Sequence, residues 1–364
     1  MDWFYVLFVS YVTLIGLNSK VLFASGMRSV TVSGFEFFAV FFTIVYTFLL
    51  VGMRDSNGLG DTPQYLYVFD NLQSLGSSWI DGFQLYGNTE LLFWPAAYAF
   101  KALGFSAESW MAAIVVVTTA IVAYSYKGLG LGRLWYVAFS GLYLTYYIVF
   151  MAAIRQSIAE SLVLLAIVLA RSNKIASSVF FLVAATGFHS SAALGFSILI
   201  LRRFNIKPKL MAASIFIAFI GSVLAPSILA SVFGAFGFEN TLGKVAMYSS
   251  VDGGNEFGNL FQHKQFLLLF VVFVSYLAIF RGATDIVYKF IFFLVFILFF
   301  FWSMPVMSGR VMGYLTLLLP YMVAKLALKF LGESNSIIFC WLLFSIMGIL
   351  VLSTKSTQLV LGFI

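Results

Sequence analysis

The segment RRFNIKPK, residues 202–209, lies between apolar runs at 189–201 and 210–234 and contains no acidic residue. In membrane proteins, Lys and Arg gather in the short loops on the cytoplasmic side. We therefore place this segment in the cytoplasm and assign the rest of the chain outward from it. On this assignment further basic pairs share the cytoplasmic side: Lys20 with Arg28, Lys127 with Arg133, Arg171 with Lys174, Arg281 with Lys289, and Lys325 with Lys329.

The composition also indicates a membrane protein. Of the 364 residues, 62% are hydrophobic and only 10% are charged, whereas soluble domains carry roughly 25% charged residues. The net charge of +7 comes from basic residues in short loops and does not indicate binding to nucleic acid. The single cysteine, Cys340, cannot form an internal disulfide. We read the N-terminal apolar run as an uncleaved first span.

A membrane span needs about 20 apolar residues. The sequence predicts an all-α polytopic membrane protein, with residues 1–364 as a single integral membrane domain of about 12–14 transmembrane helices, short re-entrant segments included. The run 88–103 contains Pro95 and Lys101 and is interpreted as re-entrant or interfacial. Two short runs meet at Gly187-Phe188-His189, which predicts a helix break there. The runs are 2–17, 35–53, 106–126, 133–150, 155–171, 175–187, 189–201, 210–234, 264–280, 285–304, 310–328 and 336–354.

The opposite side of the membrane then receives the segments 54–105 and 235–263 as outward-facing regions. Polar residues at the ends of apolar runs also fall on this outer side, which predicts one outward-facing site. They are Arg54, Asp61, Arg155, Gln156, Glu160, His189 and Arg310.

The arginines Arg54, Arg155 and Arg310 each stand where an apolar run begins or ends. A guanidinium group presents planar donors that match phosphate oxygens and stays charged at any relevant pH. Three of them together can bind a pyrophosphate. The alternative for each is that its side chain extends to the lipid headgroups.

Asp61 precedes Thr62-Pro63, a typical helix start with Asp61 or Thr62 as the cap. Capping alone explains Asp61, and general base catalysis is the alternative. His189 is either a hydrogen-bonded interior residue or a proton acceptor or phosphate partner. Gln156 and Glu160 are spaced i, i+4 and share a helix face, and Glu160 can hydrogen-bond a neighbouring helix. No metal-binding motif occurs in the sequence.

Four segments in this order resemble the EpsG/Wzy family of bacterial polysaccharide polymerases, and together they cover most of the chain. They are RDSNGLGDTPQYLYVF (Arg54, Gly60, Asp61, Tyr65, Phe69), RQSIAESL (Arg155, Gln156, Ala159), FHSSA (Phe188, His189, Ser191, Ala192) and GRVMGY (Gly309, Arg310, Tyr314).

The resemblance implies a GT-C type glycosyltransferase in the bacterial cytoplasmic (inner) membrane that needs no metal and no cofactor. Such enzymes polymerise polyprenyl-pyrophosphate-linked oligosaccharide units into O-antigen, capsular or exopolysaccharide on the outer face. Donor, acceptor and membrane lipid are the implied partners, together with chain-length regulator and flippase proteins.

The same resemblance implies roles for the site residues. Arg54, Arg155 and Arg310 stabilise the pyrophosphate leaving group, because positive side chains must do so without a metal. Gln156, Tyr65 and Tyr314 also bind substrate. Asp61 or His189 is the base for the acceptor hydroxyl, and we favour Asp61, with His189 donating a hydrogen bond to the pyrophosphate.

Three other functions remain open on the sequence. A flippase for the lipid-linked unit predicts polar groups at the membrane midplane, whereas here they lie at helix ends. An O-antigen ligase uses the same donor and similar arginines. A membrane acyltransferase also places a His among helices. Aromatic residues such as Tyr65, Tyr67, Trp79, Tyr86 and Trp94 either stack on sugars or form an interfacial belt.

Overall fold

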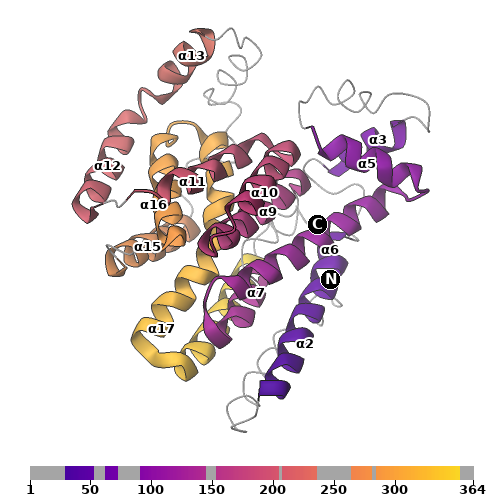
Figure 1. Cartoon of the computed structure of the whole chain (residues 1–364), viewed down its shortest axis with the longest axis horizontal. Helices are drawn as coiled ribbons and strands as arrows, with labels where there is room; N and C mark the ends of the chain where they lie inside the picture. The colour runs from indigo at the N-terminus through magenta and orange to yellow at the C-terminus, as the bar shows by residue number, and fades with distance from the viewer. Residues whose placement is uncertain are drawn as a thin grey trace. The chain divides into compact units, whose positions relative to one another are not determined.

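The computed structural model describes residues 29–52, 62–72, 91–144, 153–204, 207–235, 264–280 and 284–352. Within them every regular element is helical, as the sequence predicts (Figure 1). The chain forms two compact units: Met1–Phe196 with Val323–Ile364, and Ser197–Met322. The positions of the parts relative to one another are not determined, so each unit is described by itself. The single integral membrane domain stays a prediction.

The first unit contains most of the helices that position the candidate site. Its elements are α2 (Ser29–Thr47), η1 (Phe48–Gly52), α3 (Thr62–Asn71), α5 (Phe93–Ala102), α6 (Ala107–Gly128), η2 (Gly132–Leu134), α7 (Trp135–Leu144), α9 (Ile154–Arg171), α10 (Ile175–Phe188), η3 (Ser190–Phe196) and the later part of α17 (Pro305–Leu352).

Helix α9 is the core of this unit. Nearly all of its residues are buried, and it packs against α10, α6 and η3; Figure 1 shows α9 and α10 side by side. Close approach to α6 is possible because Gly128 has no side chain, and a Cβ there would overlap Val168 of α9. Small residues at helix contacts are typical of membrane proteins, since they allow backbones to pack closely.

Helix α6 has the length and the ends of a stable span. Its N-cap Ser106 accepts a hydrogen bond from Ser109 N–H at 3.2 Å. Glu108 in the first turn and Lys127 in the last complement the helix dipole. Its 22 residues extend about 33 Å, enough to cross a hydrocarbon core of about 30 Å.

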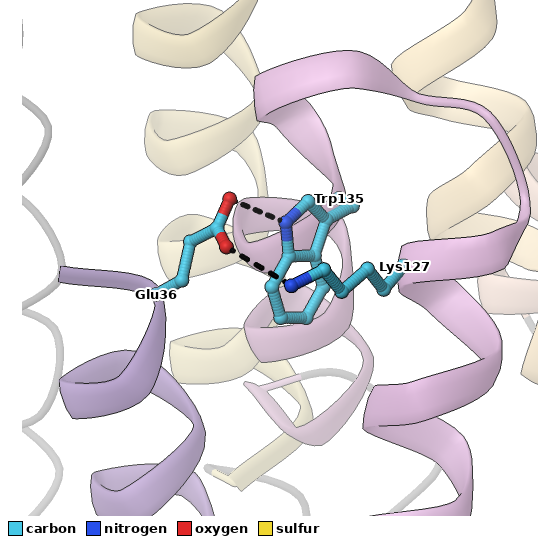
Figure 2. Close-up of polar contacts among 3 residues, drawn as sticks. All are labelled: Glu36, Lys127 and Trp135. Carbon is cyan, nitrogen blue, oxygen red and sulfur yellow. Dashed lines mark hydrogen bonds and ion pairs between the residues drawn. The ribbon is translucent and has the colours of Figure 1, made fainter. Parts of the chain in front are cut away.

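Glu36 of α2 joins three helices of the first unit (Figure 2). Its Oε1 accepts a 2.9 Å hydrogen bond from Trp135 Nε1 of α7. Its Oε2 lies 3.5 Å from Lys127 Nζ at the end of α6. Lys127 Nζ also stands 5.7 Å from the centre of the Trp135 ring. One carboxylate therefore ties α2 to α6 and α7.

Helix α17 is interrupted at Gly332, where φ is 72° and ψ is 172°. These angles are outside the helical region and are easily adopted only by glycine. The break falls between the predicted spans 310–328 and 336–354. After it, Phe344 packs against α7 at Gly141, where a Cβ would overlap the Phe344 ring.

The second unit is built around α16 (Ile286–Phe300), which packs against α11 (Ser197–Leu201), α12 (Pro208–Gly221) and α15 (Lys264–Ile279). Asp285 caps α16 by accepting a hydrogen bond from Val287 N–H at 3.1 Å. The Tyr276 ring centre lies 5.9 Å from that of Tyr288 and 6.2 Å from that of Tyr321, in tilted and edge-on arrangements. The other elements are α13 (Ala225–Ala235) and the start of α17.

The run 210–234, expected as one span, is bent by 75° between Ala213–Gly221 and Ala225–Ser231. Pro226 explains the bend, because it has no N–H to donate to the carbonyl of Ser222 and its ring clashes with that carbonyl in a straight helix. The Ser222 carbonyl instead accepts hydrogen bonds from Ala225 N–H at 3.3 Å and from Ser303 Oγ.

Among the described residues, two helices are long and apolar enough to cross a membrane: Ala107–Gly128 and Val306–Leu350. The bent pair adds a third if it is one span. The expected number of spans and the GT-C architecture stay predictions. Shorter apolar helices are Glu36–Thr47, Ile175–Phe188, Ser190–Leu201 and Ile286–Phe300.

Candidate functional site

The α9–α10 hairpin brings Arg155 and His189 to one end of the first unit. Arg155 is the second residue of α9, and His189 directly follows α10. The two helices are joined by a turn in which Asn173 has φ 61°, and they pack against each other along their length. Two packed helices joined by so short a turn run antiparallel. The start of α9 therefore lies beside the end of α10.

Arg155 is buried and is held by Tyr65 of α3. Its Nε donates a 2.8 Å hydrogen bond to Tyr65 Oη, and its Cζ lies 5.2 Å from the centre of the Tyr65 ring. The exposed fractions are 8% for Arg155 and 3% for Tyr65. These two contacts fix the plane of the guanidinium group, which is the feature that matters for two-point recognition of phosphate.

Tyr65 is in turn held by α5. Its ring centre lies 5.5 Å from that of Phe93 and 6.4 Å from that of Trp94. Both aromatic residues are almost fully buried, so Trp94 is part of the core and not of an interfacial belt. Tyr67, on the other face of α3, is 62% exposed. Trp79 and Tyr86 lie outside the described residues.

Helix α5 also connects α3 to α10. Lys101 donates hydrogen bonds to the carbonyls of Phe69 at 2.8 Å and Asp70 at 2.7 Å, near the end of α3. Leu92 N–H donates to the carbonyl of Gly187 in α10 at 2.9 Å. With 10 residues, α5 extends about 15 Å, which is too short for a span. A continuous set of contacts thus runs from Arg155 to the residues beside His189.

His189 breaks the helix as the sequence predicts. Its backbone is extended, with φ −157° and ψ 127°, between α10 and η3. Its ring is buried, and Nδ1 accepts a 3.2 Å hydrogen bond from Ser191 N–H and lies 2.8 Å from Ser191 Oγ. Because Nδ1 accepts from a backbone N–H, a neutral His189 ring carries its proton on Nε2. This assignment makes Nε2–H a hydrogen-bond donor.

Gln156 and Glu160 share a face of α9, as the i, i+4 spacing predicts. Gln156 Nε2 donates a 2.7 Å hydrogen bond to Glu160 Oε1. Glu160 is completely buried, and its Oε2 has no hydrogen-bond partner among the described residues. The hydrogen bond of Glu160 is thus with its own helix, where it orients the Gln156 amide. The sequence placed Glu160 on the outer side with a neighbouring helix as its suggested partner, and it assigned no role to Phe93 or Ser191, which hold Tyr65 and His189.

The other predicted site residues either lie outside the described residues or belong to the second unit. Arg54 and Asp61 lie outside the described residues, although α3 begins at Thr62, as the capping pattern predicts. Arg310 and Tyr314 lie one turn apart on α17 in the second unit, with Tyr314 buried and Arg310 half-buried. Their joining the Arg155 cluster stays a prediction. Within the described ranges, no group of three or more His, Cys, Asp or Glu residues gathers as in a metal site.

Comparison with known proteins adds one finding. No curated protein and no solved structure matches the chain. Among protein-family models, that of the EpsG family matches residues 39–362, a range that includes every motif residue from Arg54 to Tyr314. The match covers nearly the whole chain, and it confirms the resemblance drawn from the four ordered segments. The chain therefore belongs to the EpsG family.

Proposed function

We propose that this protein is a membrane glycosyltransferase that polymerises polyprenyl-pyrophosphate-linked oligosaccharide units outside the cytoplasmic membrane. EpsG is a Wzy-like polymerase family, which suggests a polysaccharide polymerase-type function. The observation that carries the proposal is the buried Arg155–Tyr65 pair, which joins two of the family-like segments at the end of the α9–α10 hairpin where His189 lies.

The start of α9 is electrostatically suited to a pyrophosphate. The first N–H groups of a helix carry partial positive charge and bind anions. Ala153 at the N-cap has no side-chain oxygen to accept from them. The Arg155 guanidinium adds a full charge at the same place. Both groups are fixed before substrate arrives, and preorganised charge is the most effective way to stabilise a leaving group.

The proposed reaction is a transfer at the anomeric carbon of the donor glycan. The bond from this carbon to the pyrophosphate oxygen breaks, and a bond to a hydroxyl oxygen of the acceptor unit forms. Polyprenyl pyrophosphate leaves with the electron pair, stabilised by Arg155, with Arg54 and Arg310 proposed to join it. Asp61 takes the hydroxyl proton as general base. His189 donates from Nε2–H to the pyrophosphate, a role that its tautomer supports.

The decisive experiment uses purified protein reconstituted in liposomes with lipid-linked repeat units. A ladder of lengthening glycans with release of polyprenyl pyrophosphate is the expected product. Transfer of a single finished glycan to another lipid acceptor would instead identify a ligase, and movement of intact units across the bilayer a flippase. Either result without the ladder overturns the proposal.

Arg155→Ala tests the pyrophosphate role. We expect the rate of chain extension to fall by about 10²-fold or more, the usual effect of removing a preorganised charge from the leaving group. Arg203→Ala removes the same charge from an exposed position outside the proposed site and serves as the control. Near-normal extension by Arg155→Ala, at equal membrane levels, would contradict the role.

Asp61→Asn separates the two roles of Asp61. Asn caps helices about as well as Asp, so the start of α3 is retained while the basic carboxylate is lost. We expect extension to fall by about 10²–10⁴-fold, the usual contribution of general base catalysis. Full activity of the variant would leave capping as the role of this residue.

A further inference from the structure

Two cationic side chains from different helices bind the backbone of the turn between α6 and η2. Arg171, at the end of α9, lies with Nη1 3.4 Å from the carbonyl oxygen of Gly128 and donates to it. Lys325, on α17, donates to the carbonyl of Gly130 at 3.1 Å. All of these residues belong to the first unit. The two side chains are thus held beside each other by the backbone of one turn.

Gly130 makes room for this arrangement. Its φ is +70°, and a Cβ built on it would lie 2.8 Å from Arg171 Nη1 and 3.1 Å from Nη2. The guanidinium group therefore lies directly against the glycine. Gly132, two residues on, has a similar φ of +56°, but a Cβ there meets only Glu333 Oε1 at 3.7 Å, an ordinary contact.

Further basic residues surround the turn. Lys127 and Arg133 flank it in the chain, Lys174 follows Arg171, and Lys329 follows Lys325 by one helical turn; all four are exposed. The carboxylates nearby are Glu36, which is already engaged with Lys127 and Trp135, and Glu333, beside Gly132. Among the described residues around this turn, basic residues therefore outnumber these carboxylates.

Large apolar side chains close in the chain to these cations are exposed. Phe330 and Leu331 directly follow Lys329 and are 66% and 40% exposed. Tyr124, nearly one helical turn before Lys127, is 64% exposed. Apolar surface beside a pair of ordered cations is what an amphipathic anion requires, because the charges take its headgroup and the apolar residues take its chains. A small soluble anion would use only the charges.

We infer that Arg171 and Lys325, whose side chains are held against the Gly128–Gly132 turn, form a binding site for the phosphate of the anionic phospholipid phosphatidylglycerol. The acyl chains lie along the exposed apolar residues beside the turn. The site is at the opposite end of α9 from Arg155, about 24 Å away along the helix. It is independent of the proposed polymerase reaction, and its test reads lipid binding.

Purified, delipidated full-length protein is titrated with phosphatidylglycerol, and bound lipid is measured by native mass spectrometry. The double variant Arg171→Ala, Lys325→Ala should bind about 10²-fold more weakly, since each hydrogen bond from a charged side chain to the phosphate contributes about tenfold or more. The control is Arg202→Ala, Arg203→Ala, which removes the same charge from two exposed residues of another loop. An equal loss in both double variants overturns the site, because it would show a general charge effect.

Gly130→Ala tests the geometry without changing the charge. The new Cβ displaces the end of the flexible Arg171 side chain, so the lipid affinity should fall by about fivefold while the protein stays folded. Gly132→Ala places a similar strain on the backbone and leaves Arg171 in place, so it should bind as the unaltered protein does. Equal affinities of the two variants contradict the inference.

Two further titrations identify the ligand. Phosphatidylcholine with the same acyl chains should bind much more weakly than phosphatidylglycerol, and equal binding overturns the requirement for an anion. Inorganic phosphate and glycerol phosphate at millimolar concentration should not displace bound phosphatidylglycerol. Displacement by either overturns the assignment to a lipid in favour of a soluble anion.

Discussion

Arg155 is a charged group in a place where charge is costly. Placing an Arg at the centre of a membrane helix costs about 2.5–3.5 kcal/mol on insertion scales. Here Arg155 is 8% exposed, and its guanidinium meets the hydroxyl and the ring face of Tyr65. Those contacts offset part of the cost, and they also fix the orientation of the group. A residue held in this way is more useful for binding phosphate than one that extends freely to the headgroups.

Tyr65→Phe tests whether that orientation matters. The substitution keeps the ring, its contacts with Phe93 and Trp94 and its place over the guanidinium, but it removes the hydrogen bond to Nε. Hydrogen bonds to charged groups contribute about 1.5–3 kcal/mol, so we expect the rate of chain extension to fall by about 10-fold or more. Extension is measured with purified protein and lipid-linked units. An unchanged rate would show that the ring alone positions Arg155.

His189→Gln distinguishes a hydrogen-bond donor from a base. The Gln amide can donate a hydrogen bond as Nε2–H does, but it cannot accept a proton at neutral pH. Because Nδ1 of His189 is occupied by Ser191 N–H, we expect His189→Gln to keep measurable chain extension and His189→Ala to lose about 10²-fold. If both variants are equally inactive, His189 acts as the base and Asp61 does not.

At the scale of elements, the sequence was most informative where a break has a local chemical cause. The short apolar runs that meet at Gly187-Phe188-His189 predicted the end of α10, and the extended backbone of His189 confirms it. The bend at Pro226 has an equally local cause. Because the run 210–234 is apolar throughout, the sequence nevertheless predicted one uninterrupted span there. For Trp94 the sequence left sugar stacking and an interfacial belt as alternatives, whereas in the structure this residue is buried and its ring centre lies 6.4 Å from that of Tyr65.

The Glu36 cluster provides a test at this scale. Glu36→Ala removes both the hydrogen bond to Trp135 and the pair with Lys127, so we expect the free energy of unfolding to fall by about 1.5–3 kcal/mol. Lys127→Ala removes the exposed pair and the contact with the Trp135 ring, for which about 0–1 kcal/mol and about 0.5–1 kcal/mol are expected. Thermal or denaturant unfolding of the detergent-solubilised protein measures both. A larger effect of Lys127→Ala would show that the cluster is held by charge and not by the hydrogen bond.

At the scale of the whole molecule, basic pairs far apart in the sequence were assigned to one side from charge alone. In the first unit, Arg171 and Lys325 donate to carbonyls of the turn that directly follows Lys127. The contact between Tyr65 and Arg155 was not foreseeable in the same way. It joins residues 90 positions apart, and a single sequence has no local pattern that encodes such a distant pairing.

Two ends of one helix allow the orientation to be tested. Lys174 precedes α10 and Ser190 follows it, both are exposed, and they stand about 24 Å apart along the helix axis. If Arg155 and His189 face outward, Ser190→Cys reacts with a membrane-impermeant maleimide added to whole cells, and Lys174→Cys reacts only after permeabilisation. The only native cysteine, Cys340, is buried, and Cys340→Ala removes its background.

Asn57→Cys and Asn259→Cys extend the labelling test to the segments predicted to face outward, and we expect both to react in intact cells. The reverse pattern, with Lys174→Cys labelled from outside and Ser190→Cys protected, would turn the molecule over in the membrane. The basic end would then face outward, against the rule that cytoplasmic loops carry the excess of Lys and Arg. An outward-facing polymerase site around Arg155 would be excluded by the same result, because that residue lies at the Ser190 end of the α9–α10 hairpin.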